Sequence, residues 1–211
     1  EPDGLLAVGG NLNPDTLETA YSKGIFPWYT EGEPIFWWSP SERAVLFPGG
    51  LHISKGSRKQ LRKLSFTLSS NVAFEQVIHH CAETRALSGT WITEEIVEAY
   101  IRMHQLGIAQ SVEVWEGEEL VGGLYGIKLG SVFCGESMFN LKDNAAKFAF
   151  CNLAVTLFKR GYTMIDCQMP NDFLLSLGVI SMNRDRFQSL LTSAKDDKSV
   201  HWPTIWEPTE F

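Results

Sequence analysis

The stretch between residues 111 and 168 constrains the fold more than any other part of this chain. Three strand-like runs follow one another with only short turns between them, at residues 111–115, 120–129 and 131–139. A long helix is then predicted over about residues 143–160, where Gly161 closes it, and a further strand follows at 162–168. This order predicts an α+β fold with a mixed, mostly antiparallel sheet.

Residues 1–41 differ in composition from the rest of the chain. They are rich in Gly, Pro and aromatic residues, which is typical of a small, turn-dominated unit, and one short helix is expected at 14–23 between Asn13 and Gly24. Further strands are expected at 45–47 and 66–68, and further helices at 55–63, 71–82, 94–106 and 184–191. We therefore predict a small N-terminal domain, 1–41, and a larger catalytic domain, 42–211.

The order of elements in the larger domain resembles the acetyltransferase-like (GNAT-type) architecture. That fold usually holds the pyrophosphate of coenzyme A on a Gly-rich loop that opens the long helix, where free backbone N–H groups face the anion. Here the corresponding stretch, residues 140–145, contains no glycine, and the carboxylate of Asp143 would repel phosphate. The fold is therefore predicted without its usual cofactor.

Composition excludes several classes of protein. The chain has 211 residues, of which 44% are hydrophobic and 20% charged, so it can bury a core and is not disordered. No apolar run is long enough to span a bilayer and no signal peptide is visible, although the chain starts at Glu1 without a Met.

The cysteines predict neither disulfides nor a metal site. None of them has C-x-x-C spacing and each lies among apolar residues, so we expect reduced, buried thiols. The cluster His79-His80-Cys81 lacks a second pair of ligands at zinc-like spacing.

Positive charge is concentrated in one short stretch of an otherwise acidic chain. The net charge of −7 argues against a generic nucleic-acid coat. After Ser54, a suitable helix N-cap, five cations recur at i, i+3, i+4, i+7 and i+8, which is one helical face: Lys55, Arg58, Lys59, Arg62 and Lys63. Most such faces are simply solvated; the alternative is a local grip on an anionic partner.

The last predicted strand carries an acid and an amide inside an apolar run. Asp166 and Gln168 are two residues apart, so strand alternation predicts that they stand side by side, with Cys167 on the opposite face as core packing. Burying a charge is costly without a partner or a role. Glu136 repeats this theme in the run Phe133–Phe139. Either chemistry or a closed hydrogen-bond network explains these residues.

Several motifs occur together in a characteristic order along the chain. They are residues 4–10 (GLLAVGG), 24–28 (GIFPW), 37–40 (WWSP), 89–93 (GTWIT), 120–126 (LVGGLYG), 133–139 (FCGESMF) and 165–168 (IDCQ). With them the chain resembles the bacterial leucyl/phenylalanyl-tRNA–protein transferases, from Gly4 to about Leu191. One position departs from the family pattern, because Phe173 stands where a histidine is usual.

The resemblance implies a cytoplasmic, monomeric enzyme with no metal, no organic cofactor and no membrane partner. It would move leucine, or less readily phenylalanine, from an aminoacyl-tRNA to the N-terminal Lys or Arg of an acceptor protein. The product would then carry a degradation signal, an N-degron.

The resemblance also implies roles for particular residues. Asp166 and Gln168 would be catalytic, with Asp166 orienting Gln168 or a proton route, and Glu136 would bind an amino group. Trp28 and Trp91 would stack on the terminal adenosine, although most tryptophans are core residues. The basic helix would hold the tRNA acceptor stem. An apolar pocket for the leucine side chain would comprise Leu124, Phe133, Met138, Phe150, Leu153 and Ile165.

Two functions from other classes compete with this interpretation. An acetyl-CoA-dependent N-acetyltransferase would need the Gly-rich loop that is absent here. A non-catalytic RNA-binding protein would be expected to have a basic surface overall, which the net charge of −7 does not provide.

Overall fold

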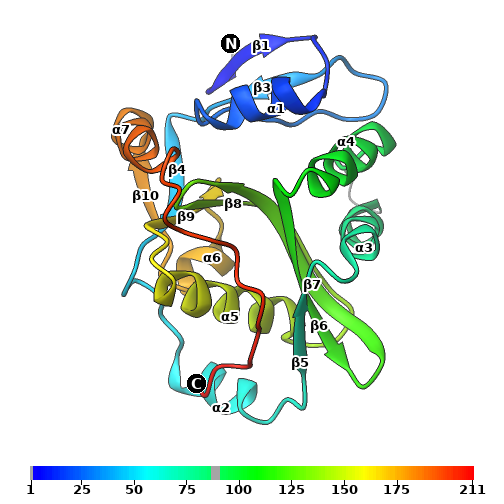
Figure 1. Cartoon of the computed structure of the whole chain (residues 1–211), viewed down its shortest axis with the longest axis vertical. Helices are drawn as coiled ribbons and strands as arrows, with labels where there is room; N and C mark the ends of the chain where they lie inside the picture. Colours follow the sequence, from blue (N-terminus) through cyan, green and yellow to red (C-terminus); the bar gives the residue numbers. More distant parts are fainter. Residues whose placement is uncertain (1, 87–90) are drawn as a thin grey trace.

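The computed structural model describes residues 2–86 and 91–211 (Figure 1). Gly89 and Thr90, which belong to one of the motifs above, lie outside the described residues. No helix in the described part is long and apolar enough to cross a membrane.

The main sheet has seven strands in the order β10-β4-β9-β8-β7-β6-β5. All neighbouring pairs are antiparallel except β8 and β9, which run parallel. The prediction of an α+β fold with a mixed, mostly antiparallel sheet is confirmed. The strands are β4 Glu42–Leu46, β5 Thr67–Ser70, β6 Ala109–Glu116, β7 Glu119–Leu129, β8 Val132–Asn140, β9 Met164–Gln168 and β10 Ile180–Asn183.

The parallel pair exists because a helix connects its strands. Parallel neighbours cannot be joined by a tight turn, and α5 (Ala145–Lys159) provides the crossover along one face of the sheet (Figure 1). Buried residues surround α5 on most sides, because the C-terminal segment covers its outer face: Asn152 Oδ1 accepts the Thr209 N–H at 2.6 Å, and Phe211 packs edge-on against Phe148.

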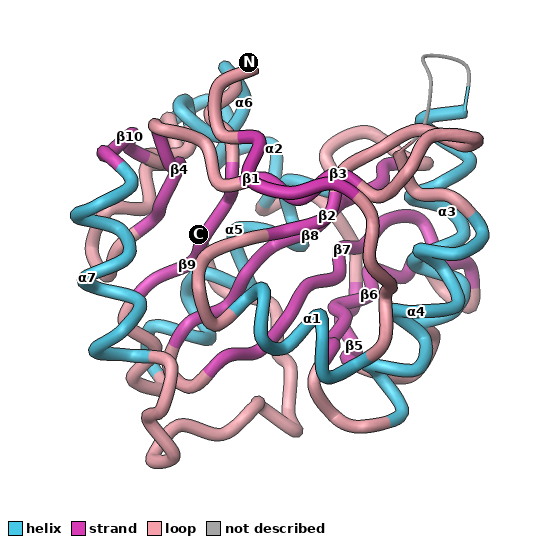
Figure 2. Tube along the Cα trace, turned by 90° about the horizontal axis from the view of Figure 1, so that it is seen from above, coloured by secondary structure: helices cyan, strands magenta, loops and turns pink. Residues whose placement is uncertain are grey.

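The opposite face of the sheet is covered by α3 (Phe74–Ala86) and α4 (Glu94–Gln105). The N-terminal unit caps one end of the sheet beside α4 (Figure 1, Figure 2). Leu17 and Tyr21 of α1 (Pro14–Tyr21) share one continuous core with Ile96 and Tyr100 of α4. The boundary predicted at residue 41 remains a prediction.

The predicted helix at 14–23 is present as α1, and turns and loops make up much of the N-terminal unit, but the sequence did not predict its sheet. The unit contains a three-stranded antiparallel sheet in the order β1 (Leu5–Val8), β3 (Phe36–Trp38), β2 (Phe26–Pro27). Strands of two to four residues are too short to show alternation in the sequence.

Other boundaries shift for local reasons. The helix expected at 71–82 is α3 and begins at Phe74, because Asn71 adopts a left-handed conformation (φ 61°) and its Oδ1 accepts the Ser111 N–H at 2.9 Å. The basic helix α2 (Lys55–Leu61) ends before Lys63. Two short elements, α6 (Asp172–Ser176) and β10, were not predicted, and α7 spans Arg184–Ala194.

Close packing of α5 on β7 requires a glycine. A Cβ built at Gly122 would lie 2.5 Å from the Ala145 Cβ and 3.1 Å from the Ala145 backbone carbon. Gly122→Ala should therefore lower the free energy of unfolding by about 1–3 kcal/mol, because the backbone of α5 has to move. Denaturant unfolding measures this. Gly56→Ala in α2, where nothing lies within 4 Å, is the control and should be neutral or mildly stabilising. Equal effects of the two changes would contradict this packing argument.

Candidate active site

The parallel strands β8 and β9 separate before they end. Their ladder stops at the pair Cys134 and Asp166, although β8 continues to Asn140 and β9 to Gln168. Each strand also carries a bulge here. Glu136 is the extra residue of β8 opposite β7, and Cys167 is the extra residue of β9 opposite β4. Bulges redirect side chains, and these two lie on adjacent strands.

A pocket of about 260 Å³ opens where the strands separate. Every residue predicted for the apolar subsite lines it, as do Trp28, Trp91, Glu136 and Gln168. Asp166 does not. The remaining lining residues were not predicted: Phe26, Pro27, Tyr125, Gly135, Ser137, Cys167, Met169, Pro170, Asn171 and Leu174.

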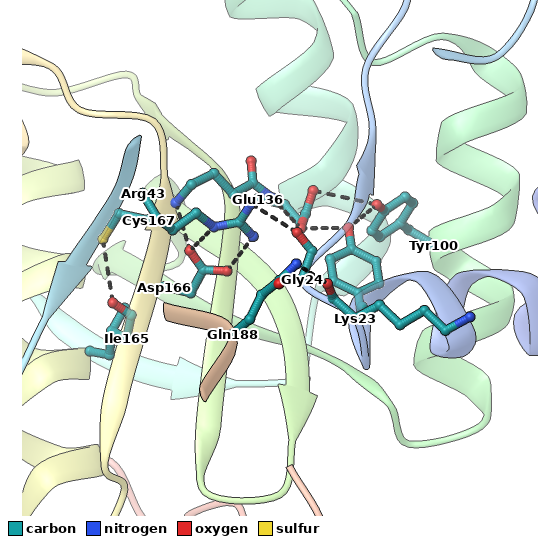
Figure 3. A network of polar contacts seen from close by, with 11 residues as sticks. Lys23, Gly24, Arg43, Tyr100, Glu136, Ile165, Asp166, Cys167 and Gln188 are labelled. Carbon is teal, nitrogen blue, oxygen red and sulfur yellow. Dashed lines mark hydrogen bonds and ion pairs between the residues drawn. The ribbon is translucent and has the colours of Figure 1, made fainter. Parts of the chain in front are cut away.

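Glu136 is the buried acid of this pocket. Its Oε1 accepts hydrogen bonds from Tyr21 Oη at 2.6 Å and from Gln168 Nε2 at 2.8 Å, and its Oε2 accepts from Tyr100 Oη at 3.4 Å. The two phenol groups also contact each other. Figure 3 shows this network beside the Asp166 carboxylate. Tyr21 comes from α1 and Tyr100 from α4, so three parts of the chain meet at one carboxyl group.

Burial raises the pKa of Glu136 to about 7. The hydrogen bond from Tyr21 lowers this pKa, the nearby charge of Asp166 raises it, and Arg43 lowers it again. A carboxyl group with this pKa can exchange a proton near neutral pH. Burial, with the Glu136 charge, raises the pKa of both tyrosines well above their usual range.

Asp166 lies behind the pocket and is fully buried. Arg43 of β4 binds it with two hydrogen bonds, Nε to Oδ1 at 2.8 Å and Nη2 to Oδ2 at 2.6 Å. Asp166 Oδ1 also accepts the main-chain N–H of Gln168 at 2.9 Å.

Gln168 departs from the strand geometry that the sequence predicted. Its φ of 61° is left-handed, so the alternation argument that placed its side chain beside that of Asp166 is wrong. The connection between the two residues runs instead through the Gln168 main chain, and the Gln168 side chain points to Glu136.

Cys167 was expected to be core packing, and it does pack against the buried residues of that face, but it also lines the pocket. Its bulged position explains the difference. Burial, with the charge of Asp166, raises the pKa of its thiol far above the usual range. A thiol held protonated is a poor nucleophile.

The five predicted cations gather around one shallow surface groove at α2. Ser54 caps this helix by accepting the Ser57 N–H at 3.1 Å, as predicted. Arg62 donates to the backbone oxygen of Phe211. Within residues 2–86 and 91–211, Lys55, Arg58, Lys59 and Lys63 form no ion pair with a carboxylate.

A side chain already binds part of the start of α5. Asn140 Oδ1 accepts the Ala146 N–H at 2.9 Å, so a side chain already occupies one of the free donors of the first helical turn. Among the described residues, no group of three or more His, Cys, Asp or Glu side chains is placed to bind a metal ion.

Comparison with known proteins identifies the family. The sequence model of the leucyl/phenylalanyl-tRNA protein transferases matches residues 45–192, and the model of their N-terminal domain matches residues 10–41. The chain belongs to the leucyl/phenylalanyl-tRNA protein transferase family. It is therefore an enzyme, an aminoacyltransferase, as the sequence motifs predicted.

Curated members of the family align along all or nearly all of the chain. The leucyl/phenylalanyl-tRNA–protein transferase of Idiomarina loihiensis is 49% identical over 100% of this chain and 89% of its own length. Those of Cellvibrio japonicus (47%, 100% of this chain, 92% of its own length) and Flavobacterium johnsoniae (51%, 92% of each chain) are similarly close. Among solved structures, L-PGS from Bacillus licheniformis is 12% identical with a TM-score of 0.44, over 76% of this chain and 52% of its own.

In this leucyl/phenylalanyl-tRNA protein transferase, sequence reasoning missed three residues of the polar network. Arg43 was detectable in principle, because it is a charge next to the apolar run Ala44-Val45-Leu46. Nothing in the sequence marked Tyr21 or Tyr100 as part of a site, because a tyrosine on the apolar face of a helix is usually an ordinary core residue. Phe173, the departure from the family pattern, lies on α6 with Lys147 Nζ 6.0 Å from its ring.

The raised pKa of Glu136 predicts how stability depends on pH. The folded state binds a proton more tightly than the unfolded chain, so ionisation of Glu136 destabilises the fold as pH rises from about 4.5 through about 7. Glu136→Gln removes this penalty. The variant should match the wild type near pH 4 and exceed its free energy of unfolding at pH 8.5 by up to about 3 kcal/mol.

Urea unfolding at a series of pH values measures the difference. Glu118→Gln, at an exposed turn position, changes the net charge by the same amount and serves as the control. A stability difference between Glu136→Gln and wild type that is the same at both ends of the pH range would contradict the assignment.

Proposed function

We propose that the enzyme transfers leucine, and less readily phenylalanine, from the 3′ end of an aminoacyl-tRNA to the N-terminal Lys or Arg of an acceptor protein. The observation that carries this proposal is the pocket. One part of it is apolar and suited to a leucine side chain, and its polar wall is the pair Glu136 and Gln168. The enzyme acts in the cytoplasm as a monomer, and its product is a degradation signal.

The reaction exchanges an ester for an amide and needs no ATP. The amine nitrogen of the acceptor attacks the ester carbonyl carbon, the bond from that carbon to the ribose oxygen breaks, and the proton lost by the amine ends on the ribose oxygen. An α-amino group has an ordinary pKa of about 7.7–8.0, so a fair fraction is already neutral near pH 7. The enzyme therefore mainly positions the two substrates and assists the proton transfer.

Glu136 and Gln168 are the residues that touch the substrates in this proposal. Gln168 holds the aminoacyl group or the incoming amine through its carboxamide. Glu136 binds an amino group, and a pKa near 7 lets it accept that group's proton. Asp166 has no surface in the pocket, so we assign it the role of orienting Gln168.

The predicted apolar subsite selects the transferred amino acid. A pocket that offers only apolar contacts discriminates weakly, because one methylene is worth about 1–3 kcal/mol. Met138, a flexible side chain, can adapt to either leucine or phenylalanine.

Trp28 and Trp91 are assigned to the terminal adenosine. Trp28 is 39% exposed and packs edge-on against Trp38 with ring centroids 5.8 Å apart, which leaves part of its ring free. Trp91 is half-buried on the lining of the same pocket. Stacking of a base on one such ring contributes about 1–3 kcal/mol.

The competing functions have less support. For an acetyl-CoA-dependent enzyme, the Asn140 side chain occupies a donor that the pyrophosphate would need. A non-catalytic RNA-binding protein does not require a buried acid with a pKa of about 7 on the wall of a pocket, whereas an enzyme that transfers a proton does.

Transfer itself is the first test of the proposed function. Labelled leucine should move from leucyl-tRNA to a protein with N-terminal Lys or Arg, without added ATP, metal ion or coenzyme A, because the ester already carries the free energy needed. The measurement is acid-precipitable label that survives RNase. The same acceptor with an acetylated N-terminus is the control. Loss of transfer in EDTA, or a requirement for acetyl-CoA as donor, would refute the proposal.

The cations of the basic groove at α2 should affect the reaction only when the aminoacyl donor carries a tRNA acceptor stem. Arg58→Ala with Lys59→Ala should raise the KM for aminoacyl-tRNA, and each lost phosphate contact should reduce the slope of log K against log salt by about 0.7–0.9. These two residues are chosen over Arg62 because Arg62 also bonds to Phe211. An adenosine that carries a phenylalanyl ester has no stem and should react at the wild-type rate.

The matched control is Arg160→Ala with Lys198→Ala, which removes two exposed cations elsewhere. It should leave both donors unaffected. Equal loss with both donors in the α2 variant would show that the helix supports the fold instead, and no loss with either would make the groove an ordinary solvated surface.

A further inference from the structure

Arg43 is the most completely enclosed cation among the described residues, with 1% of its surface exposed. Besides its two bonds to Asp166, its Nη1 donates to the Gly24 carbonyl at 3.1 Å. Its guanidinium lies 4.9 Å from the ring centre of Phe26 and 4.6 Å from that of Phe187. Figure 3 shows the guanidinium between Gly24 and the Asp166 carboxylate. The side chain is therefore fixed in position and in orientation.

The Asp166 carboxylate, held in place by Arg43, in turn holds the main chain of Gln168. Its Oδ1 accepts from Arg43 Nε and from the Gln168 main-chain N–H. A left-handed conformation is unfavourable for a glutamine, so it needs a specific contact to hold it, and this hydrogen bond is that contact. With its backbone so held, the Gln168 side chain reaches Glu136 at 2.8 Å.

Residues of the N-terminal unit contact both the first and the last side chain of this network, Arg43 and Glu136. Tyr21, the last residue of α1, donates to Glu136, and Gly24, three residues later, accepts from Arg43. Neither Arg43 nor Asp166 lines the pocket.

We propose that Arg43 is a positioning residue for the transfer reaction, which holds Gln168 in its reactive conformation through Asp166 and ties that conformation to the docked N-terminal unit. This proposal rests on the proposed function. Arg43 is needed as an arginine, because only a planar fork binds both carboxylate oxygens while a third donor reaches Gly24. A lysine keeps the charge and loses this geometry.

Arg43→Lys tests the geometry. A small displacement of a reacting group is costly, so kcat should fall at least about tenfold with aminoacyl-tRNA and with the minimal phenylalanyl-adenosine donor, while both KM values stay within about twofold. The control is Arg184→Lys. Arg184 also donates to an N-terminal carbonyl, that of Ser39 at 2.7 Å, but does not contact Asp166, and it should keep the wild-type kcat. An Arg43→Lys enzyme with unchanged kcat, or equal losses in both variants, would overturn the proposal.

A double-mutant cycle asks whether Arg43 acts through Gln168. Once Gln168→Ala has removed the side chain, adding Arg43→Lys should cost kcat no more than about twofold, because the positioned group is gone. Losses that multiply would mean that Arg43 supports the fold generally, which would overturn the proposal.

Replacing both Arg43 and Asp166 with apolar residues separates an effect on the stability of the fold from an effect on the position of Gln168. Arg43→Met with Asp166→Leu should fold at least as stably as Arg43→Lys, since apolar replacement of a buried ion pair is often neutral or stabilising. It should nonetheless lose kcat, because the Gln168 N–H has lost its acceptor. A folded double variant with wild-type kcat would make the pair purely structural.

Hydrogen exchange of the enzyme without substrate tests the link between Arg43 and Gln168 independently of the proposed transfer reaction. The main-chain amide of Gln168 should be protected from hydrogen exchange in the wild type and exchange faster in Arg43→Lys, with Arg184→Lys unchanged. If the wild type transfers no leucine but the amide behaves in this way, the proposed function fails and the Arg43 linkage to Gln168 stands. An amide that is equally protected in all three proteins refutes the linkage.

Discussion

The buried ion pair between Arg43 and Asp166 is the contact on which the site depends. Removing two charges from water costs several kcal/mol for each ion, and an apolar pair of similar volume is often as stable. Stability alone therefore does not explain the pair. The ion pair does orient the Asp166 carboxylate. Its two parallel hydrogen bonds, of 2.8 and 2.6 Å, fix both carboxylate oxygens, so that Oδ1 points at the main-chain N–H of Gln168. An apolar pair cannot supply such an acceptor.

The electrostatics of the pocket follow from the same arrangement. Glu136 and Asp166 are two buried acids that share one cation, and Arg43 binds Asp166 directly with both hydrogen bonds. Within the described residues, the Glu136 carboxylate receives hydrogen bonds from neutral donors alone, so burial dominates its pKa and raises it to about 7. Two neighbouring carboxyl groups thus acquire different tasks from their surroundings, one permanently paired and one able to exchange a proton.

Hydrophobic periodicity and turn residues predicted the long strands of the main sheet and the crossover helix, because such patterns report directly on long elements. The residues assigned to the apolar subsite were implied by the family resemblance instead, and all of them line the pocket. The sequence did not predict what depends on distant contacts. Arg43 and Asp166 are separated by 123 positions, and Tyr21 and Glu136 by 115, so no local pattern connects them. It also placed Gln168 by strand alternation, which fails because its left-handed backbone depends on one hydrogen bond to a buried carboxylate. The strands of the N-terminal sheet were too short to show any period.

Charge distribution accounts for how an acidic enzyme can hold a polyanion. At physiological ionic strength, electrostatic interactions at a surface are screened over about 8 Å, so a phosphate close to the surface experiences nearby charges and hardly any of the net charge of −7. The basic groove at α2 offers such a local field, because most of its cations are not neutralised by ion pairs within the described residues. Under the proposed function, affinity for the tRNA acceptor stem and chemistry at its 3′ end can be adjusted separately, the first by exposed cations and the second by a buried network.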